Sequence, residues 1–180
     1  MRLGLMASAV ALLMAGAADA SDFKVTSADF GDGKLKNAQY ANVMGCTGDN
    51  VSPEVTWSGA PEGTKSFVVT MYDKDAPTGS GWWHWIVVDI PATATSLEAG
   101  AGKDLARLPK GAHMTSTDAG EAIYGGACPP PGEVHQYAIT VKALKIDTLP
   151  IPPNASAALV GFVSNMNALA TATIVATGSR

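Results

Sequence analysis

The sequence predicts a mostly β protein, a β-sandwich with one helix at its periphery. Nineteen glycines and eleven prolines are spread over 180 residues, and this frequency indicates many turns and therefore many strands. Several short segments alternate between apolar and polar residues or are rich in β-branched and aromatic residues, whereas one late segment has the apolar period of a helix. A succession of strands with a single late helix favours a sandwich over an alternating βαβ fold.

Six strands are expected in chain order. The clearest are residues 65–73, where Phe67 and every second residue after it share one face as far as Asp73, and residues 83–90, which Pro91 closes. The six lie at residues 22–30, 54–59, 65–73, 83–90, 135–144 and 171–178.

One helix is expected over residues 154–170, with Asn154 or Ser156 as its N-terminal cap. Residues 93–132 are interpreted as a loop-rich stretch because they contain the most turn-dense segments of the chain. The sequence has no dinucleotide-binding fingerprint, no phosphate-binding loop and no serine-hydrolase elbow.

Residues 1–20 have the pattern of a secretory signal peptide. Arg2 precedes an apolar run over residues 3–18, and Ala18-Asp19-Ala20 fits the small-x-small rule for cleavage. The run is too short to be a membrane anchor, and no cysteine follows it directly, which argues against a lipoprotein. We therefore expect a cleaved signal peptide at residues 1–20, one domain over residues 21–180, and a periplasmic or secreted protein.

Composition excludes two classes of partner. Apolar residues make up 47% of the chain, charged residues 16%, and the net charge is −4 with no basic cluster. Nucleic-acid binding needs a concentration of Lys and Arg, and so does electrostatic attachment to anionic membranes. No second apolar run is long enough to form a transmembrane segment.

The chain has two cysteines, Cys46 and Cys128. Export places them in an oxidising compartment, where such a pair often forms a disulfide. Two buried free thiols are the alternative, because sequence alone cannot bring the two Cα atoms together.

Four polar residues fall where strands are expected to end or to face one another. Asp73 ends one strand, and His84 lies within the tryptophan-rich segment GWWHW, where alternation places it with Trp82, Ile86 and Val88. His135 and Tyr137 lie two residues apart and therefore point the same way from a third strand. If these strands are neighbours, the side chains form a small pocket with two imidazoles, a phenol and a carboxylate.

Such a pocket suits an anion with several oxygens. His84, His135 and Tyr137 would donate hydrogen bonds, which an apolar wall strengthens, and Asp73 would orient a histidine. Simpler interpretations remain: each histidine can be a satisfied core residue, Asp75-Ala76-Pro77 a turn, and the tryptophans packing. A metal site built from Asp73, His84 and His135 lacks tight ligand spacing, and His113 is interpreted as a loop residue.

Three segments carry a family resemblance. YDKDAPTGSGWWHWIVVDIP and YGGACPPPGEVHQYAITVKAL resemble the two signature blocks of the phosphatidylethanolamine-binding protein (PEBP) family, and GCTGDNVSPEVTWSGAPEGTKSF resembles the stretch that precedes them. The resemblance is nearest to the bacterial Raf-kinase-inhibitor-like branch, the YbhB/YbcL type. It implies a PEBP-like β-sandwich of antiparallel-rich sheets with one or two peripheral helices and a small pocket for anions.

The resemblance also implies the residues of that pocket. The matching positions, all expected to bind the ligand, are Asp73, Asp75, Pro77, Trp82, His84, His135 and Tyr137. The chain departs from the family pattern at Lys74, which replaces a usual proline, at Gln136, which stands where arginine is frequent, and at Ala127, which replaces a common proline.

The function predicted from these observations is an exported binding protein for a small anionic ligand, phosphate-like or a phospholipid head group. No enzyme activity, cofactor or metal is expected. A homodimer is expected from the family. Two alternatives stay open: an inhibitor or regulator of a protein partner such as a protease or kinase, and a small hydrolase in which an Asp73–His84 pair activates water. Against the hydrolase, no serine or cysteine nucleophile lies beside a base in the sequence.

Overall fold

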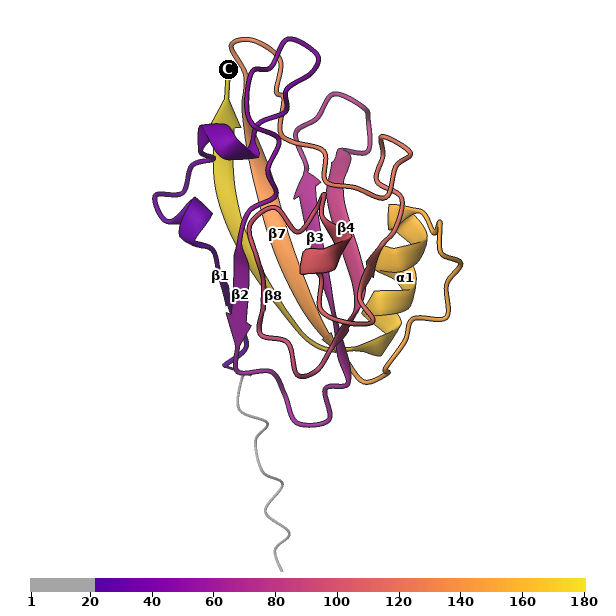
Figure 1. Cartoon of the computed structure of the whole chain (residues 1–180). Coiled ribbons are helices and arrows are strands. Elements are labelled where there is room, and N and C mark those ends of the chain that lie inside the picture. Colours follow the sequence, from indigo (N-terminus) through magenta and orange to yellow (C-terminus); the bar gives the residue numbers. More distant parts are fainter. Residues whose placement is uncertain (1–21) are drawn as a thin grey trace, which may run out of the picture.

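The computed structural model of the chain describes residues 22–180, and the expected signal peptide at residues 1–20 lies outside the described residues. Within them, two antiparallel sheets and a single α-helix make up the architecture, together with three short 3₁₀ helices (Figure 1). The prediction of a mostly β protein is therefore confirmed. No helix in the described part of the chain is long and apolar enough to cross a membrane.

The small sheet has the strand order β1-β2-β5, with β1 at Lys24–Thr26, β2 at Val55–Ser58 and β5 at Ser96–Leu97. The large sheet has the order β6-β4-β3-β7-β8, with β6 at His113–Met114, β4 at Trp82–Pro91, β3 at Ser66–Asp73, β7 at Val134–Leu144 and β8 at Ala168–Ser179. The helix α1 spans Ala157–Asn167, and the 3₁₀ helices are η1 (Ala28–Phe30), η2 (Asn37–Gln39) and η3 (Leu105–Arg107).

Five of the six expected strands agree with the structure to within a few residues. The first differs, because residues 22–30 form only the short strand β1 before the side chain of Ser27 accepts a hydrogen bond from the Asp29 amide and caps η1. The structure also places β5 and β6 in the stretch interpreted as loop. Each has two residues, too few for a periodic pattern.

Both faces of the large sheet are covered (Figure 1). One face packs on the small sheet, with Phe67, Met71 and Trp85 in the same cluster as Val25 and Trp57. The opposite face carries a second cluster that α1 covers, formed by Val68, Ile86, Val88, Leu144, Leu149, Ala155, Ala157 and Val160. A strand buried on both faces needs a nearly continuous apolar run, and this accounts for the SFVVTM and WIVV segments of β3 and β4.

Candidate functional site

Predicted site residues come together at one end of the sandwich, where β3 ends and β4 and β7 begin. Asp73 pairs with Trp82 on β4 and with Tyr137 on β7. Directly paired residues of antiparallel strands project to the same face, so these three side chains point into the space between the two sheets. His135 lies two residues before Tyr137 on β7 and shares that face.

His84 reaches the same face through an irregularity in β4. Met71 pairs with Trp85 but Tyr72 pairs with Trp83, so His84 is an extra residue between the two pairs, as in a β-bulge. Its ring then lies 5.4 Å from the ring of Tyr137. The sequence-based expectation that His84 shares a face with Ile86 and Val88 is wrong, because the bulge interrupts the period of two and those residues face α1.

A chain of hydrogen bonds runs from Asp73 through His135 to Glu133. His135 Nδ1 lies 2.7 Å from Asp73 Oδ2, and His135 Nε2 lies 2.9 Å from Glu133 Oε2. Asp73 and His135 are buried, whereas the Glu133 side chain is 53% exposed. Sequence reasoning missed Glu133, although its position two residues before His135 on the same face was an available signal.

The two carboxylates favour the charged form of His135. Burial by itself would lower the pKa of His135, but the hydrogen bonds to Glu133 and Asp73 outweigh it, and the pKa lies above its ordinary value. Both ring nitrogens of His135 are hydrogen-bonded to carboxylates of the protein.

Asp75 and Pro77 lie in the turn after β3. The other oxygen of Asp73 accepts hydrogen bonds from the amides of Asp75 and Ala76, at 2.9 and 3.1 Å, and closes this turn. Asp75 in turn accepts a hydrogen bond from the amide of Gln136 at 2.8 Å, which ties the turn to β7. Pro77 is exposed on the turn.

His84 and Tyr137 each carry a buried polar atom without a partner. His84 Nδ1 lies 2.8 Å from the carbonyl oxygen of Gly125. A carbonyl only accepts, so Nδ1 bears the proton, and His84 Nε2 has no hydrogen-bond partner. The hydroxyl of Tyr137, a fully buried residue, also has none. Buried unpartnered polar groups are costly. Three other such atoms in the described residues lie on Gln39, Trp57 and Thr115, none of them a predicted site residue. The pair on the neighbouring rings of His84 and Tyr137 marks this place as a candidate site.

The pKa shifts of these two rings have the same origin. Burial lowers the pKa of His84, against smaller opposing effects of the Gly125 carbonyl and the Asp73 carboxylate. Burial raises the pKa of the Tyr137 hydroxyl, and the nearby Asp73 carboxylate adds to this effect. The hydroxyl and that carboxylate approach one another, but they do not reach hydrogen-bonding geometry. At neutral pH the pair therefore presents a neutral imidazole and a protonated phenol.

Several contacts restrain the segment that begins with Gly125, whose carbonyl accepts a hydrogen bond from His84. The amide of Gly126 donates to the side chain of Asn50 at 2.7 Å, and a Cβ at Gly126 would lie only 2.4 Å from the Ala41 backbone nitrogen. Next to it Cys128 forms a disulfide with Cys46, which confirms that alternative over free thiols. These contacts leave the Gly125 carbonyl little freedom to turn away from the imidazole.

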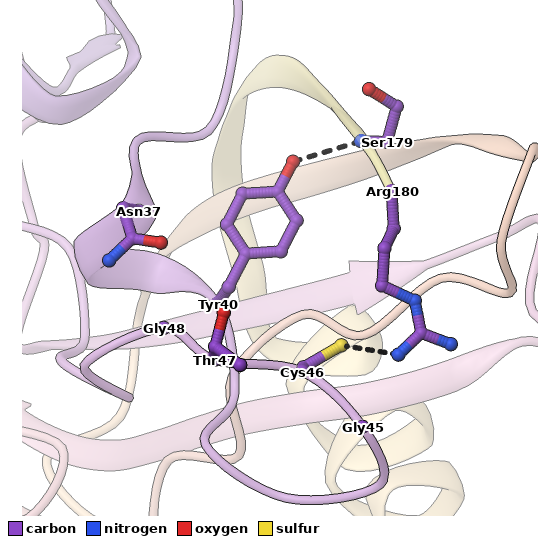
Figure 2. A pocket seen from close by; sticks show the side chains of 8 residues that line it. All are labelled: Asn37, Tyr40, Gly45, Cys46, Thr47, Gly48, Ser179 and Arg180. Atoms are coloured by element: carbon purple, nitrogen blue, oxygen red, sulfur yellow. Dashed lines mark hydrogen bonds between the residues drawn. The ribbon is translucent and has the colours of Figure 1, made fainter.

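A hollow lies beside Tyr40 (Figure 2). It has a volume of about 370 Å³ and is lined by Asn37, Tyr40, Gly45, Cys46, Thr47, Gly48, Ser179 and Arg180. None of the seven predicted site residues lines it, so the predicted anion pocket stays a prediction. Gly178 lies between the two places, because a Cβ there would be 2.8 Å from the ring of Tyr137 and 3.1 Å from the Tyr40 hydroxyl oxygen.

Two alternative chemistries can be compared with this geometry. Asp73 is hydrogen-bonded to His135 and not to His84, so the Asp73–His84 pair of a hydrolase is not formed. Cys128 is oxidised and cannot serve as a nucleophile in this state. Across residues 22–180 no group of three or more His, Cys, Asp or Glu side chains could hold a metal ion.

Comparison with known proteins decides the family. The sequence model described as phosphatidylethanolamine-binding protein matches residues 26–179. The chain belongs to this family.

Bacterial members of the family are similar over most of their length. The chain is 50% identical to the UPF0098 protein YbcL of Escherichia coli over 173 residues, which is 94% of each chain, and 50% identical to YbhB of the same organism over 154 residues, 85% of this chain and 98% of YbhB. The crystal structure of YbcL, described as a new member of the mammalian PEBP family, superposes with a TM-score of 0.84 at 51% identity and covers 88% of this chain and 98% of YbcL. A putative lipoprotein, LppC of Mycobacterium tuberculosis, is 33% identical over 138 residues, 76% of this chain and 62% of its own.

Proposed function

We propose that the chain is an exported binding protein for a small oxyanion, phosphate or a phosphate-bearing head group, held where β3 ends and β4 and β7 begin. The observation that carries the proposal is the pair of buried, unpartnered polar atoms on His84 and Tyr137. A ligand oxygen that accepts from the Tyr137 hydroxyl would remove the cost of leaving that group unsatisfied. The family's description as phosphatidylethanolamine-binding supports a phosphate-bearing ligand.

The other predicted residues take supporting roles in this proposal. Asp73 orients His135 through its Nδ1–H, and Asp75 holds the turn against β7. Ligand oxygens reach His135 when Glu133, whose side chain is half exposed, swings away from Nε2. Trp82, opposite Asp73, and Pro77, on the turn, form the wall at the mouth.

Export is supported by three independent features. Residues 1–20 have the signal-peptide pattern, Cys46 and Cys128 form a disulfide, and one similar protein is described as a putative lipoprotein. Disulfides persist in oxidising compartments such as the periplasm. A homodimer stays a prediction, as does regulation of a protein partner.

Calorimetric titration of the mature protein with inorganic phosphate tests the binding role through a matched pair of variants. Tyr137→Phe removes the unpartnered hydroxyl, and a hydrogen bond to a charged group contributes roughly 1.5–3 kcal/mol, so affinity should fall about 10- to 100-fold. Tyr72→Phe is the control, because Tyr72 is a neighbouring tyrosine on the other face of β3 whose hydroxyl donates to the Ser80 carbonyl at 2.8 Å. Its affinity should be unchanged.

Neither variant is expected to unfold the protein. Removing a buried hydroxyl that has no partner relieves a desolvation cost, so Tyr137→Phe should melt at or above the wild-type temperature. Equal phosphate affinity in wild type, Tyr137→Phe and Tyr72→Phe would contradict the assignment of the site.

A further inference from the structure

The two unpartnered atoms at the site differ in what they can do. The Tyr137 hydroxyl can donate or accept a hydrogen bond, whereas His84 Nε2 can only accept one because the Gly125 carbonyl keeps the proton on Nδ1. A ligand that satisfies His84 Nε2 must therefore donate a hydrogen bond. A fully ionised oxyanion accepts hydrogen bonds but has none to donate.

The charges around His84 add a second constraint. The side chains and carbonyls that face it are Asp73, Asp118 and Tyr137, and the backbone oxygens of Gly125 and Gly126. Asp118 is fixed beside β4, where it accepts a hydrogen bond from the Trp83 amide at 2.9 Å. None of these groups is a cation, and the nearby carboxylates of Asp73 and Asp118 repel a second negative charge on the ligand.

We propose that this site selects an oxyanion that carries its own proton, such as the monoanion of a phosphate monoester or inorganic phosphate, over sulfate and over phosphodiesters that have no donor group of their own. One P–O⁻ or P=O oxygen accepts from Tyr137 Oη–H, and the P–O–H donates to His84 Nε2. The inference rests on the proposed function and specifies its ligand class. A phosphodiester such as dimethyl phosphate has no P–O–H and leaves His84 Nε2 without a donor.

The competing arrangement has His84 take up a proton and donate to a fully ionised anion. Asp73 and Asp118 favour the imidazolium, but burial of the ring opposes it more strongly and the pKa of His84 lies below its ordinary value. The two arrangements differ in where the proton lies, and the protonation state of the His84 ring distinguishes them directly.

The test compares methyl phosphate, dimethyl phosphate, sulfate and inorganic phosphate by calorimetric titration of the mature protein between pH 6 and pH 8. Methyl phosphate loses its remaining proton with a pKa of about 6, so its affinity should fall roughly 50-fold across this range. Inorganic phosphate gains a second negative charge in this range but keeps a P–O–H in both of its ionic forms, so its affinity should fall much less than that of methyl phosphate. Dimethyl phosphate and sulfate should bind at least about tenfold more weakly than methyl phosphate at pH 6, the factor that about 1.4 kcal/mol represents.

Two further readouts separate failure of this inference from failure of the proposed function. The ¹⁵N shifts of His84 should report a neutral ring with its proton on Nδ1 in the phosphate complex. His84→Gln can turn either an N–H or a C=O toward the ligand and should bring dimethyl phosphate and methyl phosphate to similar affinity. Dimethyl phosphate that binds wild type as tightly as methyl phosphate, with His84 protonated, would overturn the inference and leave the binding function standing. If none of the four anions binds, a buried water satisfies both atoms and both proposals fail.

Discussion

The Cys46–Cys128 bridge joins two loops that lie 82 residues apart in the chain. Replacing both cysteines by alanine opens the loop that the bridge closes in the unfolded state. In the chain-entropy model a loop of this length corresponds to about 4.5 kcal/mol of stability. For a single domain this is a large part of the total, which ordinarily lies at about 5–15 kcal/mol.

Urea unfolding followed by tryptophan fluorescence measures the effect. With a slope of about 2 kcal/mol per molar urea, the midpoint should fall by about 2 M in Cys46→Ala/Cys128→Ala. Wild type measured under reducing conditions is the matched control, because it loses the cross-link but keeps both side chains. The two should have midpoints within a few tenths of a molar.

Two results would refute this reasoning. A loss below about 1 kcal/mol would mean that the unfolded chain already keeps these loops together, so that the cross-link removes little entropy. A double variant much less stable than reduced wild type would mean that packing of the sulfur atoms, among them Cys46 beside the Arg180 guanidinium at 3.3 Å, carries the effect.

Two further predictions concern the hydrogen-bonded chain at the site. Glu133→Gln removes an exposed carboxylate that competes with the ligand for His135 Nε2. Phosphate affinity in calorimetric titration should therefore rise by up to about fivefold, which corresponds to the free energy of a surface ion pair. Lower affinity would contradict a competing role. The folded-state pKa of His135 lies above its unfolded value of about 6.5, so its ion pair stabilises the protein fully below that pH and loses its contribution as pH rises through the folded pKa. The stability lost in His135→Asn, measured by urea unfolding, should therefore be larger at pH 6 than at pH 9, and a difference that grows with pH would show that the sign is wrong.

The sequence alone contained the strands that carry the site and most of its residues. The periodicity of β3 and β7 placed Asp73, His135 and Tyr137 on inward faces, and the signature blocks grouped them with His84. The strand predictions agree with the structure because apolar period and β-propensity are local properties, which a chain expresses wherever the strand is later placed. The disulfide could only be offered as an alternative to free thiols, because cysteine positions say nothing of Cα separation.

Tertiary structure decided what each polar atom does. The bulge at His84, the Gly125 carbonyl 41 residues away that sets its tautomer, and the Asp73–His135 contact across 62 residues all depend on which strands are neighbours and in what register. Sequence reasoning counted His84, His135 and Tyr137 as three donors. Of these three groups, the fold leaves only the Tyr137 hydroxyl as a donor without a partner, and it makes His84 Nε2 an acceptor. Hydrogen-bond direction depends on the partner that the fold supplies, and no pattern along one chain segment contains that partner.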